Sequence, residues 1–302
     1  MVMTDIRTAT QIVSENIDSS LSVIEAKPLH GGMVNTVEKW LTDGHPSSIV
    51  VKVSPKKNDD ELESEFKSMR WFREHTSFPI PEPYACLSFD RGQTGTFLLM
   101  EFINARSLSS ARLSSRGIRQ VQLELAAILI ELHSHTRDTY GPPYESSGPK
   151  KWLDIFNPEI EQNFIKTKNR LGRQSQYVIQ KMLNKLEELM PEFNRPTLIH
   201  SDLWSTNIMV DDTNPGNPCI VSFIDLQSLF AEVEYELAYL RIFSTVTKAF
   251  FDKYTEKYPL KDGFENRCLI YWLNTMMLHV HLFGDAYLSS CENIVRKIGK
   301  FL

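Results

Sequence analysis

The sequence contains few cysteines, no long apolar run and only a small excess of one charge. Its four cysteines, Cys86, Cys219, Cys268 and Cys291, form no C-x-x-C pair, which indicates reduced thiols rather than a disulfide scaffold. No run of about 18 apolar residues occurs, which argues against a membrane span. The amino terminus also lacks a basic segment followed by an apolar one, which is the pattern of an export signal. We therefore expect a cytoplasmic protein with no membrane partner.

The charge and size of the chain limit the kinds of protein that it can be. The formal net charge of −5 argues against a protein that holds nucleic acid by bulk electrostatics. With 302 residues and 42% hydrophobic content, the chain can bury a large core. Neither property predicts an oligomeric state. We expect a globular protein that does not bind nucleic acid.

The segment from Leu198 to Gln227 carries the clearest chemical pattern. Two strand-like apolar runs, 208–210 and 220–224, are separated by a cluster of Asp, Asn, Gly and Pro that predicts a hairpin turn. Asp202 precedes the first run with Asn207 five residues later, and Asp225 closes the second run. Magnesium takes few protein oxygens and keeps its other positions for phosphate and water. Two carboxylates and a carboxamide at one end of a hairpin therefore suit magnesium bound to a polyphosphate.

A lysine within an apolar strand is the second chemical signal. In the segment Ser48–Ser54, strand alternation places Val50 and Lys52 on one face. A lysine in such a strand is often an edge residue that reaches solvent. The next segment, 59–75, has the apolar spacing of a helix, and within it Glu65 is the best candidate to pair with Lys52. Glu61, one helical turn earlier, stays an alternative.

The rest of the chain divides into a β-rich first part and a mainly helical second part. Helical spacing is found over 8–17, 118–132 and 264–283, whereas strand character is found over 29–41 and 96–103. The segment FPIPEPYA, 78–85, reads as a turn region, and the Pro-, Gly- and Ser-rich segment 138–156 reads as a long loop. The change of character predicts a boundary between Ile103 and Asn104.

The hairpin segment resembles a known family. HSDLWSTN, 200–207, followed by Ile224 and Asp225, is similar to the H-x-D-L-W-x-x-N and I-D segments of fructosamine (ketosamine) kinases, within the aminoglycoside phosphotransferase and protein-kinase-like superfamily. EYELAY, GFENR and HLFGDAY resemble later segments of the same family. The resemblance implies an α+β, two-lobed protein-kinase-like fold, with a nucleotide-binding lobe over 1–103 and a catalytic, acceptor-binding lobe over 104–302.

The resemblance also implies a nucleotide site for ATP with Mg²⁺. The family's glycine-rich loop corresponds to Gly31 and Gly32, although such a pair taken alone is an ordinary hairpin turn. Lys52 would hold the α and β phosphates, and the backbone from Glu101 to Ile103 would receive the edge of the adenine. Met100 fits a core position equally well. The implied nucleotide-binding residues are Gly31, Gly32, Asn35, Thr36, Val50, Lys52, Glu65, Met100, Glu101 and Ile103.

On the catalytic side, the resemblance implies a base, a metal site and an acceptor site. Asp202 would accept the proton of the acceptor hydroxyl, and Asn207 and Asp225 would hold the metal. His200 would tie the catalytic segment in place as a scaffold residue. The implied acceptor-binding residues are Trp204 and His279, and packing is the alternative role for the histidine.

The chain departs from the family in the long loop, which decides what acceptor we expect. Of the family's element there it keeps only Gly141, Trp152 and Phe156, while Ser201 replaces a glycine and Leu226 replaces a proline. Neither replacement removes a functional group. We expect a kinase for a sugar–amine adduct, free or protein-bound, with an altered acceptor preference. The alternatives are an aminoglycoside- or choline-type kinase and a non-catalytic nucleotide-binding relative.

Overall fold

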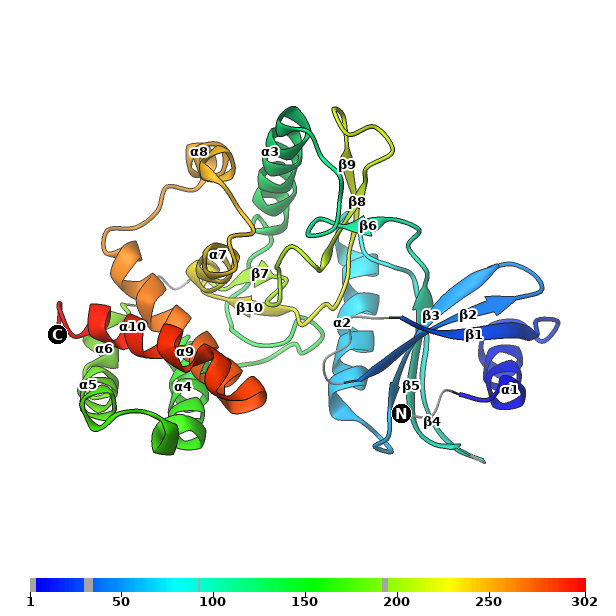
Figure 1. Ribbon diagram of the computed structural model, residues 1–302, viewed down its shortest axis with the longest axis horizontal. Helices are drawn as coiled ribbons and strands as arrows, with labels where there is room; N and C mark the ends of the chain where they lie inside the picture. Colours follow the sequence, from blue (N-terminus) through cyan, green and yellow to red (C-terminus); the bar gives the residue numbers. More distant parts are fainter. Residues whose placement is uncertain (1–3, 30–34, 92, 192–194) are drawn as a thin grey trace. The chain divides into compact units, whose positions relative to one another are not determined.

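The structure, a computed structural model, describes residues 4–29, 35–91, 93–191 and 195–302 (Figure 1). Its contacts divide the chain into two compact units, which are described here one at a time. The first contains residues 1–111, 207–212 and 220–227, and the second contains 112–206, 213–219 and 228–302. Most of the hairpin thus belongs to the first unit. The predicted functional boundary at Ile103 stays a prediction.

An antiparallel sheet of five strands, in the order β1-β2-β3-β5-β4, forms the centre of the first unit. Two helices accompany it, and one of them, α2, packs against β4 and β5. The strands and helices are β1 (Val23–Leu29), β2 (Thr36–Thr42), β3 (Ser48–Ser54), β4 (Pro83–Arg91), β5 (Gln93–Glu101), α1 (Ile6–Asn16) and α2 (Asp60–His75).

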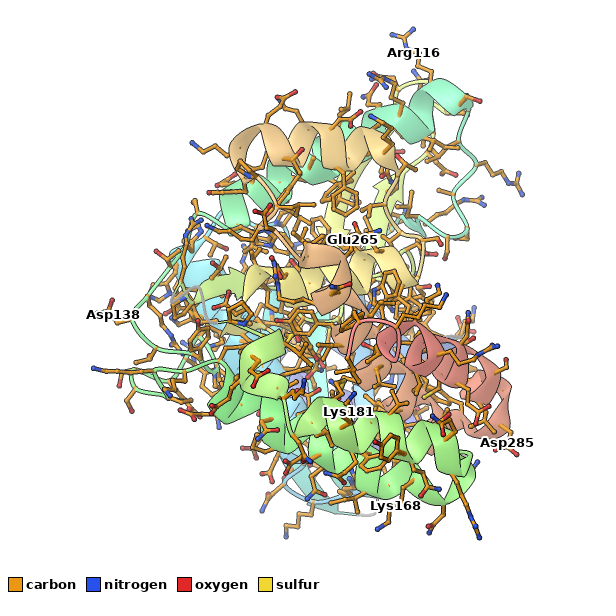
Figure 2. All side chains as sticks on the ribbon, turned by 90° about the vertical axis from the view of Figure 1, so that its left-hand side faces the viewer. Arg116, Asp138, Lys168, Lys181, Glu265 and Asp285 are labelled. Atoms are coloured by element: carbon orange, nitrogen blue, oxygen red, sulfur yellow. The ribbon has the colours of Figure 1, made fainter. Side chains whose placement is uncertain are left out.

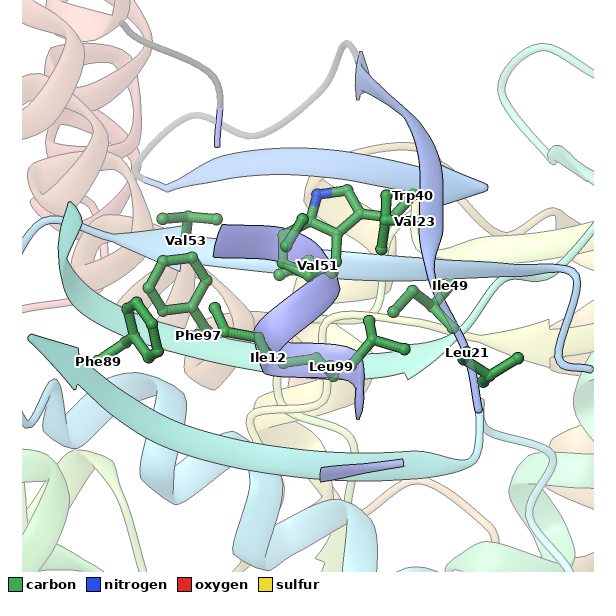
Figure 3. Close-up of a cluster of buried hydrophobic side chains, with 12 residues drawn as sticks. Ile12, Leu21, Val23, Trp40, Ile49, Val51, Val53, Phe89, Phe97 and Leu99 are labelled. Atoms are coloured by element: carbon green, nitrogen blue, oxygen red, sulfur yellow. The ribbon is translucent and has the colours of Figure 1, made fainter. Parts of the chain in front are cut away.

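The alternation of β3 sets the core of this unit. Ile49, Val51 and Val53 are buried on one face, whereas Val50 and Lys52 on the other face are half-buried, as the sequence predicts. The buried face meets apolar residues of α1 and the neighbouring strands, including Trp40 (Figure 3). Each large apolar side chain removed from water in this way contributes about 1.5–3 kcal/mol. The core therefore holds β3 firmly, and with it the position of Lys52.

The predicted hairpin forms a small sheet with a short strand of the first unit. Its strands, in the order β6-β8-β9, are β6 (Arg106–Ser107), β8 (Ile208–Asp211) and β9 (Cys219–Phe223). The Phe223 amide donates a hydrogen bond to the Pro79 carbonyl at 2.8 Å, and the Phe223 ring stacks on Phe78 with centroids 4.3 Å apart. These contacts fix the end of the hairpin to the segment that follows α2.

The second unit is mainly helical, and α9 packs against α4, α7 and α10. Its elements are α3 (Ser115–Leu132), α4 (Leu153–Thr167), η1 (Lys168–Arg170), α5 (Arg173–Leu183), α6 (Leu186–Leu189), β7 (Thr197–Ile199), β10 (Leu229–Ala231), α7 (Val233–Ile242), α8 (Lys248–Lys257), α9 (Phe264–Phe283), η2 (Gly284–Tyr287) and α10 (Leu288–Ile298). Charged side chains on the outer helix faces, such as Lys181 and Glu265, point away from the ribbon (Figure 2). No helix in the described ranges is long and apolar enough to cross a membrane.

The predicted mixture of a β-rich first part and a helical second part is observed, but two predicted segments were wrong in detail. The turn region around 78–85 ends at Pro83, where β4 begins, because the following residues pair with β5. The loop predicted over 138–156 ends at Trp152, because α4 begins at Leu153. Phe156 and Ile160, one turn apart and fully buried, give α4 the apolar face that the loop composition obscured.

Candidate active site

Lys52 lies between two carboxylates of the first unit. Its Nζ is 2.6 Å and 2.8 Å from the two oxygens of Glu65 and 2.5 Å from Oδ1 of Asp225. Burial alone would lower the pKa of Lys52, but the negative charges of Glu65 and Asp225 outweigh it and raise the pKa. The ammonium therefore stays charged. Glu61 is exposed, so the ion pair forms with the predicted partner, Glu65.

The end of the hairpin brings Asp225 and Asn207 together beside this ion pair. The Ile224 amide donates to the Asn207 carbonyl at 3.0 Å, which sets Asp225 opposite Asn207. Asp225 has a φ of 59°, in the left-handed region, where non-glycine residues are uncommon and often functional. Its side chain is 41% exposed, so its oxygens face solvent as well as Lys52. A carboxylate and a carboxamide are donors that suit magnesium carried by a polyphosphate.

The other predicted nucleotide residues lie along β2, β3 and β5. Gly31 and Gly32 lie outside the described residues, whereas Asn35 and Thr36 lie at the start of β2. Val50 and Met100 are partners in the register of β3 and β5, so they are neighbours across the two strands. Met100 is 4% exposed and thus mostly core, while Val50 is half-buried.

The predicted hinge follows β5. The Glu101 amide donates to the Glu82 carbonyl at 2.9 Å, and the Ile103 carbonyl accepts from the Ala105 amide at 3.0 Å. Both groups therefore already take part in the structure of this segment.

In the second unit, a buried glutamate of α7 holds the backbone of the catalytic segment. Oε1 of Glu236 accepts from the amides of His200 and Ser201, at 2.7 Å and 3.0 Å. Its Oε2 lies 2.8 Å from Nε2 of the buried His133. Burial would raise the pKa of Glu236, but the hydrogen bond and charge of His133 lower it. An ionised Glu236 therefore anchors the segment that carries Asp202.

Sequence reasoning did not single out Glu236, although it lies within the family-like segment EYELAY. Its partners, the amides of His200 and Ser201, lie 36 and 35 residues earlier, so no local pattern in the sequence marks it. His200 is itself fully buried, and its Nδ1 accepts from the Asp202 amide at 3.3 Å. This placement fits the predicted scaffold role.

Asp202 lies at one end of a group of half-buried aromatic side chains. The Tyr239 hydroxyl donates a hydrogen bond to Oδ1 of Asp202. The Tyr239 ring packs edge-on against Phe243, with centroids 4.9 Å apart. Phe243 in turn lies 5.9 Å from Trp204 and 5.4 Å from His279. The two predicted acceptor residues, Trp204 and His279, therefore meet at Phe243.

The group continues beyond His279, whose ring lies 5.0 Å from Tyr287. We define the aromatic cluster as Trp204, Tyr239, Phe243, His279, Phe283 and Tyr287. Burial lowers the pKa of His279, and its Nδ1 lies 2.8 Å from the Thr275 carbonyl, which it can reach as a donor. The ring is thus neutral near pH 7 and does not repel a cationic ligand. The other four members of the cluster, Tyr239, Phe243, Phe283 and Tyr287, were not singled out from the sequence, although three of them lie in the family-like segments EYELAY and HLFGDAY.

The loop residues that resemble the family serve packing. Gly141 has a φ of 122° and exchanges backbone hydrogen bonds with Phe230. Trp152 and Phe156 are 2% and 0% exposed, and their rings stack 5.9 Å apart. These residues therefore fix the loop within the second unit.

Comparisons with known proteins agree with this geometry. A sequence model of the fructosamine kinase family matches residues 5–300. The chain is 28% identical over 282 residues to the chloroplastic protein-ribulosamine 3-kinase of Oryza sativa subsp. japonica, covering 88% of this chain and 76% of that protein. It is 26% identical over 300 residues to the ketosamine-3-kinase of Mus musculus, with coverages of 89% and 93%.

Solved structures share the fold. A protein assigned as a fructosamine-3-kinase from Haemophilus somnus superposes with a TM-score of 0.75 at 18% identity, covering 96% of both chains. A thermostable mutant of an aminoglycoside phosphotransferase, in complex with AMP-PNP and hygromycin B, gives a TM-score of 0.69 at 17% identity, with coverages of 96% and 98%. These likenesses confirm the predicted protein-kinase-like fold.

The family model spans nearly the whole chain, from residue 5 to residue 300, and includes both the Lys52 group and the Asp202 segment. The predicted enzyme class, an ATP-dependent kinase, is that of the family and is confirmed with it. The chain belongs to the fructosamine kinase family.

Proposed function

We propose that the protein transfers the γ-phosphoryl group of ATP to a hydroxyl of a ketosamine, a sugar–amine adduct that is either free or formed on a protein lysine. The observation that carries the acceptor assignment is the position of Asp202 at the end of the aromatic cluster. Two relatives named for ketosamine and ribulosamine support it. All four cysteines are reduced thiols, which suit the cytoplasm, the compartment that we propose.

On the nucleotide side, the residues of the first unit would position the phosphates. The residues of this unit would hold a magnesium ion, which would supply positive charge to neutralise the charge that develops on the phosphates. Asp225 would bind the ion directly, with Asn207 completing its protein ligands. Lys52, held by Glu65, would contact the α and β phosphates. Gly31, Gly32, Asn35 and Thr36 would cover the phosphates, while Val50, Met100 and the backbone of Glu101 to Ile103 would hold the adenine.

On the acceptor side, Asp202 would accept a hydrogen bond from the acceptor hydroxyl and take its proton as transfer proceeds. The hydroxyl oxygen then forms the new bond to phosphorus, and the bond to the departing ADP breaks. Trp204 suits the sugar, because an indole packs on a sugar face and donates one hydrogen bond. A neutral His279 leaves the cluster without a positive charge, so it suits an acceptor that carries an amine.

Two variants separate these roles. Asp202→Asn should lower kcat by roughly 10²–10⁴-fold, the range for general acid–base catalysis, while MgATP affinity stays nearly unchanged. Asp225→Asn removes a metal ligand, so magnesium-dependent nucleotide binding should weaken along with turnover. Equal losses of nucleotide affinity in both variants would show that the two roles are wrongly divided.

An acceptor screen decides the substrate class. ADP release is measured with MgATP and, in parallel, a fructose–lysine adduct, a ribulose–lysine adduct, an aminoglycoside and choline. We expect turnover with one or both ketosamines. Rapid turnover of the aminoglycoside or choline alone would replace the ketosamine by another acceptor, and binding of ATP with no turnover of any acceptor would support a non-catalytic relative.

A further inference from the structure

Helix α7 contacts the catalytic segment at two points one turn apart. Glu236 accepts the amides of His200 and Ser201, and Tyr239, three residues later, donates its hydroxyl to Asp202. Residues three apart lie on the same face of a helix. One helix face therefore holds both the backbone of the segment and the carboxylate that the segment carries.

The phenol of Tyr239 is suited to be a permanent donor. Its burial and the negative charge of Asp202 raise the pKa of Tyr239, so the hydroxyl keeps its proton throughout the working range of pH. A hydrogen bond to an ionised carboxylate is stronger than one between neutral groups. It also restricts rotation of the carboxylate, because one of its two oxygens, Oδ1, is bound to a side chain packed against Phe243.

We propose that Tyr239 is a positioning residue, which fixes the orientation of the Asp202 carboxylate so that it meets the acceptor hydroxyl in a single geometry. This inference rests on the proposed role of Asp202 as the base. Tyr239 also packs on Phe243, which contacts the acceptor-side Trp204. The same side chain thereby links the orientation of the base to the surface that would hold the acceptor.

Helix α7 offers a matched control one turn earlier. The hydroxyl of Tyr235 donates to Oε1 of Glu159 at 3.3 Å, and so does not hold Asp202. Tyr239→Phe and Tyr235→Phe each remove one hydroxyl from the same helix and keep the ring. Only the first change removes a hydrogen bond to the proposed base.

The test compares both variants by steady-state kinetics with MgATP and the fructose–lysine or ribulose–lysine adduct, whichever the wild-type protein turns over. Tyr239→Phe should lower kcat roughly 10- to 100-fold, the equivalent of one hydrogen bond to a charged group. The KM values for both substrates should change less than about twofold, because the ring is kept. Tyr235→Phe should keep kcat within about twofold of wild type.

A double-mutant cycle shows whether Tyr239 acts through Asp202. In the Asp202→Asn background, adding Tyr239→Phe should leave the residual kcat unchanged within about twofold. An equal further loss in that background would overturn the inference, as would a wild-type kcat for Tyr239→Phe or a weakened affinity for MgATP. Full activity of Asp202→Asn alone would instead overturn the proposed base itself, so the two failures are distinguishable.

Discussion

Replacing Lys52 by methionine tests how the first unit holds its charged residues. The Glu65 side chain is 3% exposed and forms an ion pair with Lys52 at 2.6 Å. Without that cation, a buried carboxylate loses the ammonium of its ion pair, and breaking a buried ion pair in this way costs about 3–5 kcal/mol. Asp225 adds little to this cost, because its side chain is 41% exposed and water can solvate it. We therefore expect Lys52→Met to lower the free energy of unfolding by about 3–5 kcal/mol.

A double variant tests the same ion pair in a second way. Lys52→Met with Glu65→Gln removes both charges of the pair, so it should be more stable than Lys52→Met alone. Lys67→Met is the control, on the helix that carries Glu65. Lys67 pairs with Glu63 at 3.7 Å, and the two side chains are 54% and 41% exposed. An exposed pair of this kind contributes little, so the control should change stability by less than about 0.5 kcal/mol.

The assay is urea unfolding followed by fluorescence and circular dichroism, with midpoints and slopes compared across the wild-type protein and the three variants. MgATP affinity is measured on the same proteins, and Lys52→Met should lose it if this side chain holds the phosphates. A loss of stability below about 1 kcal/mol in Lys52→Met would refute the reasoning. So would a double variant that is no more stable than the single one.

Three further changes test other parts of the structure. Ser201→Gly should raise the free energy of unfolding, measured in urea, by about 0.5–1 kcal/mol. The left-handed conformation costs a serine about 1–2 kcal/mol, and removing this cost outweighs the backbone entropy that a glycine loses on folding. A destabilised variant would contradict this. Burial raises the pKa of Glu159. Its contribution to stability is therefore present below its unfolded pKa and lost as the pH rises through the folded value. Glu159→Gln should accordingly be more stable than wild type at pH 7 to 8, with the gain shrinking toward acid, whereas a gain that grows toward acid would show the sign to be wrong. Trp204→Ala should raise the KM for the ketosamine roughly 10-fold and the KM for ATP less than twofold; equal changes would remove Trp204 from the acceptor side.

The spacing of apolar residues along the chain predicted those strands and helices in which buried side chains recur regularly. Strand β3 and helix α9 have the predicted bounds, because Ile49, Val51 and Val53 alternate and the apolar residues of α9 recur at helical spacing. The resemblance to a kinase-like fold suggested an ion pair for Lys52, and the helical spacing favoured Glu65 over Glu61, which the structure confirms.

The missed features depend on partners that are distant in the sequence. Glu236 accepts amides 35 and 36 residues earlier, and Tyr239 reaches Asp202 across 37 residues. Within α7 these side chains have nothing in their spacing to distinguish them from surface residues. The strand β4 was missed because its start, at Pro83, lies in a proline-rich segment, and its pairing with β5 is a tertiary contact. Hydrogen bonds between segments that are far apart in the sequence determine these positions, and the spacing of residues along the chain does not predict them.

The two replacements within the motif concern backbone conformation and packing, whereas the charged groups are kept. Ser201 stands where the resembled family has glycine, and its φ of 76° lies in the left-handed region, at a cost of about 1–2 kcal/mol. The amides of His200 and Ser201 both donate to the ionised Glu236, and a hydrogen bond to a charged group contributes about 1.5–3 kcal/mol. These bonds suffice to hold the serine in a conformation that glycine adopts freely. Leu226, where the family has proline, is 1% exposed and fills a core position directly after Asp225. Hydrogen bonds therefore fix the backbone at Ser201 and packing fixes it at Leu226, and neither replacement removes a charged group of the segment.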